Sequence, residues 1–127
     1  MIISIPYNVP SLNKTSRQHW RSRVRDVNMC TALVRAHGWY SCNAKGRRSL
    51  LISSYRRQLC RDIQNYIGGC KSLTDGVTKA GALVDDSDKW AFISYEQHLL
   101  RDMPDELRAK FGGNPCTVLT LTDMEPL

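Results

Sequence analysis

The chain has 127 residues, of which 42% are hydrophobic and 24% are charged. These proportions are typical of a single globular domain and exclude a disordered chain. Its net charge of +6 conceals a division: residues 1–61 carry 12 Lys and Arg against one acid, a net +11, and residues 62–127 carry 6 Lys and Arg against 11 acids, a net −5. The division favours a polyanion-binding surface beside an acidic cluster, although arginines that pair with acids across the folded surface would also explain it.

The sequence contains no signal for export or for membrane insertion. No apolar run is long enough to span a bilayer, and the first ten residues, MIISIPYNVP, lack the charged and apolar regions of a signal peptide. The five cysteines are odd in number and form no CxxC pair, which disfavours a disulfide framework or a structural zinc site. We therefore expect reduced thiols in a cytoplasmic protein that has no membrane association.

In the first half of the chain, the pattern predicts strand, helix and strand. Residues 2–5 read as a strand that Pro6 ends. A helix follows, with an apolar stripe from Trp20 through Val24 and Val27 to Val34, and Gly38 is its expected end. Residues 39–48 are polar and read as a loop, and residues 48–55 read as a strand.

In the second half, the pattern predicts a helix from about Gly69 to Gly81, a turn over 82–88 and a long strand over 90–100. One or two helical turns over 104–111 and a closing strand over 116–124 complete the chain. This order indicates an α/β or α+β fold: a small single domain, residues 1–127, with two main helices packed on one mixed sheet.

The polar residues of the segment 61–88 are the candidates for a catalytic or metal-binding site. Asp62 and Gln64 follow a predicted strand and, on an extended backbone, point to the same face. Lys71 and Asp75 share a helix face with Lys79, and Asp86 follows in a turn that would return it near Asp62 if the helix packs back along the sheet. Clustered carboxylates usually persist because a divalent metal lies between them. A solvated helix cap and a surface ladder of ion pairs would give the same spacing.

The segment RDIQNYIGGCKSLTDGVTKAGALVDDSD resembles the core motif of the RusA-type Holliday-junction resolvases of phages and prophages. That motif reads roughly R-D-x-D-N, then a helical Lys, then D-x-L-x-K-x-G and a DD pair. The opening IPYNVPSLNKTSRQHWRSR and the closing TVLTLTDM also resemble the ends of that family, so that the resemblance covers most of the chain and is weakest over 39–60 and 101–115.

The resemblance implies a homodimeric, RusA-like endonuclease domain that cleaves four-way DNA junctions by paired nicks with Mg²⁺ or Mn²⁺, in DNA recombination and repair. It also implies a phage or prophage protein in the cytoplasm of a bacterial host. Carried over by position, the catalytic residues are Asp62, Lys71 and Asp86, and the metal ligands are Asp62, Gln64 and Asp86. The motif positions that remain are possible supports of the site: Asn65, Asp75 and Asp85.

One departure from the family pattern matters, because Gln64 stands where the motif has its second Asp. An amide oxygen ligates a cation only weakly, since it carries no charge, so this departure affects cleavage and leaves DNA binding intact. The residues expected to meet the DNA backbone are basic and lie near the N-terminus: Lys14, Arg17, Arg21, Arg23 and Arg25. Two other interpretations stay open. One is a junction-binding protein that has lost its metal site at Gln64, and the other is a small domain whose acids and bases only pair with each other.

Overall fold

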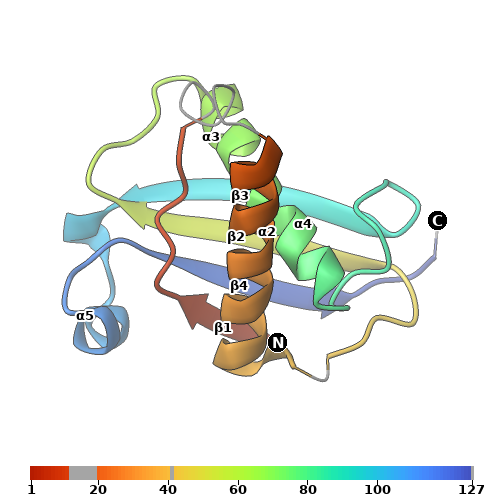
Figure 1. Cartoon of the computed structure of the whole chain (residues 1–127). Coiled ribbons are helices and arrows are strands. Elements are labelled where there is room, and N and C mark those ends of the chain that lie inside the picture. The colour runs from red at the N-terminus through yellow and green to blue at the C-terminus, as the bar shows by residue number, and fades with distance from the viewer. Residues whose placement is uncertain (12–19, 41, 127) are drawn as a thin grey trace.

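Among the residues that the structure describes, one mixed sheet of four strands is formed. The computed structural model describes residues 1–11, 20–40 and 42–126. The strands are β1 (Ile2–Ile5), β2 (Arg48–Arg56), β3 (Ala91–Leu99) and β4 (Cys116–Asp123), and their order in the sheet is β1-β4-β2-β3. β4 is antiparallel to both β1 and β2, whereas β2 and β3 are parallel (Figure 1). The predicted mixed α/β architecture is therefore confirmed.

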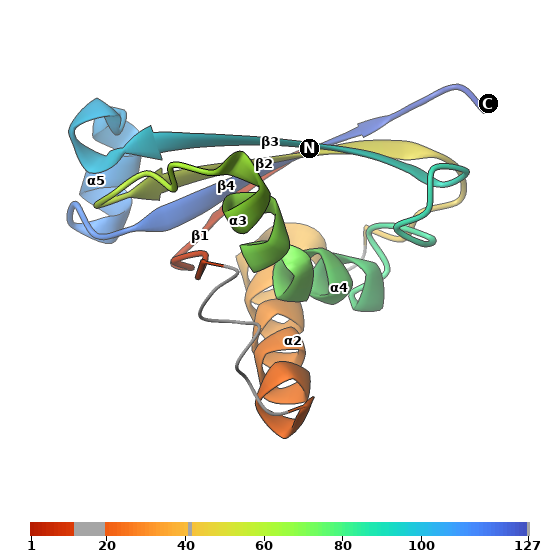
Figure 2. The ribbon, with the colours of Figure 1, turned by 90° about the horizontal axis from the view of Figure 1, so that it is seen from above.

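Three of the helices lie on one face of this sheet. They are α2 (Trp20–Val34), α3 (Ile63–Gly69) and α4 (Lys71–Lys79); α3 and α4 form the crossover between the parallel strands β2 and β3. Figure 2 shows all three on the same side, and shows α5 (Asp105–Phe111) at the end of the sheet. In the described part of the chain, no helix is long and apolar enough to cross a membrane.

The core lies between the sheet and the helices α2 and α4. Alternate side chains of β2 and β4 point to the helices, because side chains on a strand alternate between its faces. The buried residues that form this layer are Ile5, Cys30, Val34, Leu50, Ile52, Leu73, Val77, Leu119 and Leu121. All five cysteines are free, as expected.

Gly76 allows α2 and α4 to cross at close range. A Cβ atom built on Gly76 would lie 2.7 Å from Cβ of Cys30 and 2.9 Å from the backbone nitrogen of Thr31. Both distances are shorter than van der Waals contact. The crossing of the two helices therefore depends on the absence of a side chain at this position.

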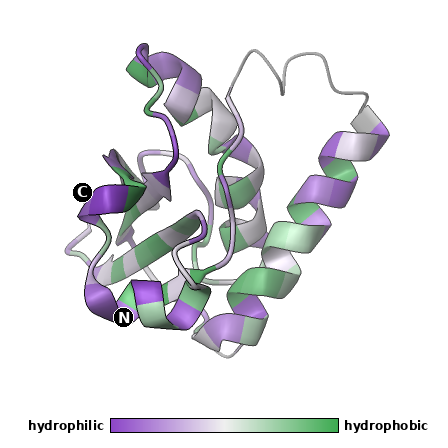
Figure 3. Ribbon diagram, turned by 90° about the vertical axis from the view of Figure 1, so that its left-hand side faces the viewer, coloured by the Kyte–Doolittle hydropathy of each residue, from purple (hydrophilic) through white to green (hydrophobic). Residues whose placement is uncertain are grey.

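The helix α2 differs from its prediction at both ends. Only its C-terminal half packs in the core, whereas Val24, expected on the buried stripe, is 49% exposed. The N-terminal half extends away from the sheet (Figures 2 and 3). At the other end, the chain continues as a π-helical turn, Arg35–Trp39, in which Gly38 has φ of 136°. α2 itself thus ends at Val34, before its expected end at Gly38, and Gly38 lies within the π-helical turn, in a left-handed region of φ that favours glycine.

The helix predicted from about Gly69 to Gly81 is α4, Lys71–Lys79, and the sequence does not predict the helix α3 that precedes it. Asp62 caps α3, which ends at Gly69, and α4 follows after Cys70. The strand β2 ends at Arg56, and the last strand ends at Asp123, one residue before its predicted end.

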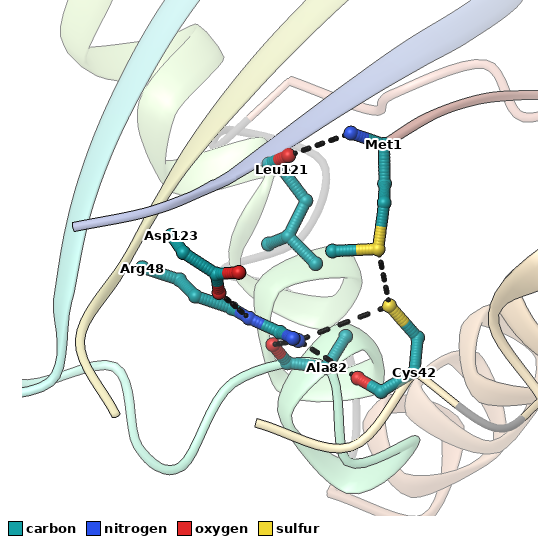
Figure 4. Close-up of polar contacts among 6 residues, drawn as sticks. All are labelled: Met1, Cys42, Arg48, Ala82, Leu121 and Asp123. Carbon is teal, nitrogen blue, oxygen red and sulfur yellow. Dashed lines mark hydrogen bonds and ion pairs between the residues drawn. The ribbon is translucent and has the colours of Figure 1, made fainter. Parts of the chain in front are cut away.

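Arg48, at the start of β2, joins three distant segments of the chain (Figure 4). Arg48 is only 8% exposed. Nε donates to Oδ1 of Asp123 at 2.8 Å, and Nη1 donates to the carbonyl oxygens of Cys42 at 2.8 Å and Ala82 at 2.9 Å. Its buried charge is therefore balanced by a carboxylate and by hydrogen bonds.

Candidate nucleic-acid interface

The clearest group of charged side chains surrounds Lys71, the first residue of α4. Its ammonium Nζ lies 2.9 Å from Oδ2 of Asp86 and 3.2 Å from Oδ1 of Asp75. The Lys71 side chain is 61% exposed, and both carboxylates face solvent in part. We call these three residues the Lys71 cluster. It presents one ammonium and two carboxylates to an incoming molecule.

Two local features place these side chains together. Asp75 lies four residues after Lys71, one helical turn further along α4. Asp86 comes from the turn between α4 and β3, which starts with hydrogen bonds from the backbone N–H of Gly81 to the carbonyl of Thr78 and from that of Ala82 to Val77. This turn therefore folds back along α4 and brings Asp86 to the start of the helix.

Lys71 and Asp86 favour each other's charged forms. The hydrogen bond to Asp86 raises the pKa of Lys71. The same hydrogen bond lowers the pKa of Asp86. Lys71 is therefore an ammonium that can donate to a phosphate oxygen, and it is not a general base. Charge interactions this exposed are screened by solvent, so the cluster adds little to the stability of the fold.

Two tyrosines lie side by side beneath the site. Tyr66 of α3 and Tyr95 of β3 meet edge to face, with 6.5 Å between their ring centroids. Burial raises the pKa of Tyr95, on which the charges of Lys71 and Asp86 also act. The rings thus connect the Lys71 cluster with the interior of the crossover between β2 and β3.

The structure does not place Asp62 and Gln64 as the sequence predicts. Asp62 is the N-cap of α3, and its Oδ1 accepts a hydrogen bond from the backbone nitrogen of Gln64 at 2.9 Å. Gln64 itself lies in the helix, so the prediction that the two side chains share one face of an extended segment is wrong. A carboxylate is a preferred N-cap, because it satisfies a backbone N–H that has no partner within the helix.

Asp86 pairs with Lys71, the first residue of α4, whereas Asp62 caps the preceding helix, α3. Of the possible supporting residues, Asp75 belongs to the Lys71 cluster, Asp85 is exposed and Asn65 is half-buried in α3. The structure therefore gathers Lys71, Asp75 and Asp86, which is only part of the expected site.

The Lys71 cluster supplies two carboxylates to a divalent cation, and both of them pair with the Lys71 ammonium. Across residues 1–11, 20–40 and 42–126, no three His, Cys, Asp or Glu side chains are close enough to hold a metal ion. Mg²⁺, however, usually binds through one or two carboxylates and completes its shell with water and substrate phosphates. Asp75 and Asp86 are two such carboxylates, and both are partly exposed.

The expected DNA-contacting residues that the structure describes lie on the protruding half of α2. Arg21, Arg23 and Arg25 are all exposed. Lys14 and Arg17 lie outside the described residues. Arg21 and Arg25 are four residues apart and share a face, and Arg23 faces another way. The described part of α2 therefore presents exposed arginines on more than one side.

A residue that the sequence analysis does not single out is Arg56, the last residue of β2. The strand pattern contains the relevant signal, because Arg56 has the same parity as the buried residues Leu50 and Ile52. An arginine at an inward position of a strand must be buried with a partner or beside a cavity.

No protein-family model matches this chain, and no curated protein matches it.

Proposed function

We propose that this protein binds DNA and acts on four-way junctions as a RusA-like, Mg²⁺- or Mn²⁺-dependent endonuclease. The observation that carries the proposal is the contact between Lys71 and Asp86. The motif pairs these two residues across fifteen positions of sequence, and their side chains meet at 2.9 Å. The proposed site thus includes the Lys71 cluster, with Asp62 and Gln64 as further ligands if α3 adjusts when substrate binds.

In the proposed reaction, water gives up a proton to solvent and attacks the phosphorus of the scissile phosphodiester; the P–O bond to the leaving sugar oxygen breaks, and that oxygen takes up a proton from solvent. A divalent cation held by Asp86 and Asp75 would polarise a phosphoryl oxygen and lower the pKa of the attacking water. Lys71 donates hydrogen bonds to a non-bridging oxygen, where negative charge increases in the transition state. The carboxylate of Asp86 keeps Lys71 protonated and oriented until the substrate arrives.

The experiment is the cleavage of a synthetic four-way junction by the full chain in Mg²⁺ and in Mn²⁺. We expect Lys71→Met to reduce the cleavage rate by at least a hundredfold and to change junction affinity by less than threefold. Lys79→Met is the matched control, because Lys79 carries the same charge on the same helix and binds Asn28 of α2. Equal loss of cleavage in both variants would contradict the assigned role of Lys71.

A second candidate function, junction binding without cleavage, is favoured by the capping role of Asp62 and by Gln64. If the wild-type protein binds junctions and never cuts them, Gln64→Asp distinguishes the two cases. Cleavage by that variant would identify an impaired nuclease, whereas continued inactivity would identify a binding protein.

We also propose that the protein acts as a homodimer. A four-way junction has two-fold symmetry, and a C₂ dimer supplies two identical sites. The sheet face opposite α2 and α4 supports this proposal. It exposes Ile2 and Phe92 and contains a hollow of about 480 Å³ that Leu51, Tyr55 and Val118 help to line. Sedimentation equilibrium with and without junction DNA tests the stoichiometry, and a monomer under both conditions would refute it.

A further inference from the structure

Arg56 is a buried cation that has no hydrogen-bonding partner in the described part of the chain. Arg56 is 9% exposed, and its Nε and Nη1 atoms are buried without an acceptor among the described residues. Burying a charged donor without an acceptor costs more free energy than burying a neutral donor without one, so such groups are rare in folded proteins. Arg56 therefore needs an explanation that the fold alone does not supply.

Arg48 shows how this fold treats a buried arginine that serves structure only. Arg48 and Arg56 lie eight residues apart on β2 and point to the same face of the sheet. Arg48 reaches a carboxylate and two backbone carbonyls (Figure 4). Arg56 instead rests on the face of the Tyr66 ring, with its guanidinium carbon 5.4 Å from the ring centroid. A structural role therefore accounts for the donors of Arg48 and does not account for those of Arg56.

A cavity of about 340 Å³ opens beside Arg56. Besides Arg56, the residues that line it are Asn8, Ser11, Arg57, Gln58, Leu59 and Cys60. Among the residues that the structure describes, the lining contains two guanidinium groups, several neutral hydrogen-bonding groups and no acidic side chain. Its charge and polarity therefore suit an anion.

The wall of this cavity is held in place before any ligand arrives. The side chain of Gln97 on β3 accepts from the backbone nitrogen of Cys60 at 3.0 Å and donates to the carbonyl oxygen of Cys60 at 3.0 Å. The hydroxyl of Tyr66 lies 2.8 Å from the carbonyl oxygen of Glu96. These contacts fix both the loop after β2 and the ring on which the guanidinium rests, so binding requires little reordering.

We infer that Arg56 and this cavity form a binding site for a phosphate group. The guanidinium rotates about its last side-chain bonds toward the cavity and donates two parallel hydrogen bonds to the phosphate oxygens, the geometry for which arginine is best suited. Arg57 adds a second positive charge at the rim. The identity of the ligand as a DNA backbone phosphate rests on the proposed function, whereas phosphate binding itself does not.

The test compares phosphate binding and DNA binding in full-length variants. Arg56→Met keeps the length of the side chain and removes the charge, and Arg56→Lys keeps the charge without the paired donors. Arg101→Met is the control for net charge, because Arg101 is exposed and lies outside the cavity. Inorganic phosphate, at ionic strength matched with chloride, is titrated by calorimetry, and a fluorescent four-way junction is titrated by anisotropy.

We expect Arg56→Met to weaken both interactions at least tenfold and Arg56→Lys to weaken them less. The control should change phosphate affinity by less than twofold. Loss of phosphate binding with unchanged DNA affinity would support the site and assign it to free phosphate or a small phosphorylated molecule. Equal affinities in wild type and Arg56→Met would overturn the inference. A wild-type protein that binds no DNA would refute the proposed function, and the phosphate titration would still test this site.

A measurement on the unmodified protein tests the same site without requiring that a variant folds. In ¹⁵N-resolved spectra, inorganic phosphate should shift the backbone amide signals of residues 56–60 in a saturable manner. If these signals do not move at phosphate concentrations that shift others, the proposed site is wrong.

Discussion

Replacement of Gly76 by alanine tests how the basic helix α2 is held on the rest of the fold. The added Cβ would lie 2.7 Å from Cβ of Cys30, 2.9 Å from the nitrogen of Thr31 and 3.1 Å from the carbonyl carbon of Cys30. Carbon atoms in contact lie about 3.5–4.0 Å apart. Because two of the three atoms belong to the α2 backbone, rotation of a side chain cannot relieve the overlap, and the helices must separate.

The expected decrease in stability follows from two opposing effects. Overpacking of a closely packed core costs about 1–3 kcal/mol. Alanine in a helix is more favourable than glycine by about 1 kcal/mol. With the cost of overpacking near its upper limit, Gly76→Ala should lower the free energy of unfolding by about 1–2 kcal/mol. For a domain of this size, that change corresponds to a decrease in Tm of roughly 4–8 °C.

Thermal and urea unfolding, followed by circular dichroism, measure this effect. Gly46→Ala is the matched control, because no described atom lies within 4 Å of the Cβ position at Gly46 and its φ is not positive. We expect Gly46→Ala to leave stability unchanged or to raise it by about 0.4–1 kcal/mol. If Gly76→Ala is as stable as the wild type, the close crossing of α2 and α4 at Gly76 is not what fixes their distance.

Three further predictions concern the site and its support. Tyr66→Phe keeps the buried ring but leaves polar partners of its hydroxyl unpaired, and it should lower the free energy of unfolding by about 1–3 kcal/mol in urea titrations. Because Lys71 lowers the pKa of Asp86, this pair stabilises the fold above the unfolded pKa of about 3.8 and ceases to do so as the pH falls below it. The difference in Tm between wild type and Asp86→Asn should therefore be constant near neutral pH and shrink below about pH 4; a difference that grows on acidification would refute the pairing. Replacement of Arg23 and Arg25 by Gln should reduce the slope of log affinity against log salt by about 1 for each phosphate that the variant no longer neutralises, and an unchanged slope would exclude both from the DNA interface.

Most of the strands could be predicted from the sequence because they contain short apolar runs bounded by polar residues or proline. The strand at 2–5 and the strand that begins at Arg48 agree with their predictions, since runs such as Leu50-Leu51-Ile52 are too short for a buried helix and are typical of strands. The short helix at 105–111 is also confirmed. Its first turn contains Asp105 and Glu106, which favour a helix N-terminus.

The helix α3 could not be predicted from its own residues, for a physical reason. Its sequence, IQNYIGG, ends in two glycines and has little intrinsic preference for a helix. The fold stabilises it through Tyr66, which is fully buried against the sheet, and through the cap that Asp62 provides. The motif favours a metal ligand at Asp62, although an Asp before a short polar segment is equally typical of an N-cap.

The candidate site was only partly predictable, because part of it depends on contacts between distant segments. The spacing of Lys71 and Asp75 predicts their ion pair, since four residues are one turn of a helix. The approach of Asp86 to Lys71 depends on how the turn after α4 folds back, and no local pattern encodes this path. Whether Arg56 is buried without a hydrogen-bonding partner depends on which elements cover the end of β2. It can therefore be determined only from the whole fold.

The charges of the two regions predict different roles in the proposed binding of DNA. The Lys71 cluster carries one positive and two negative charges, so Asp75 and Asp86 repel a phosphate unless a divalent cation neutralises them. The cavity at Arg56 has two arginines and no acid among its described lining residues, so it attracts a phosphate without a cation. Two tyrosine rings lie between the regions: Arg56 rests on Tyr66, and Tyr66 meets Tyr95, on which the charges of Lys71 and Asp86 act. Affinity measured in a chelator should therefore depend on Arg56 and be insensitive to Lys71→Met, whereas the gain in affinity on adding Mg²⁺ should depend on Asp75 and Asp86. If that gain survives the replacement of both acids by Asn, the cation acts elsewhere, and the Lys71 cluster is not the reactive centre.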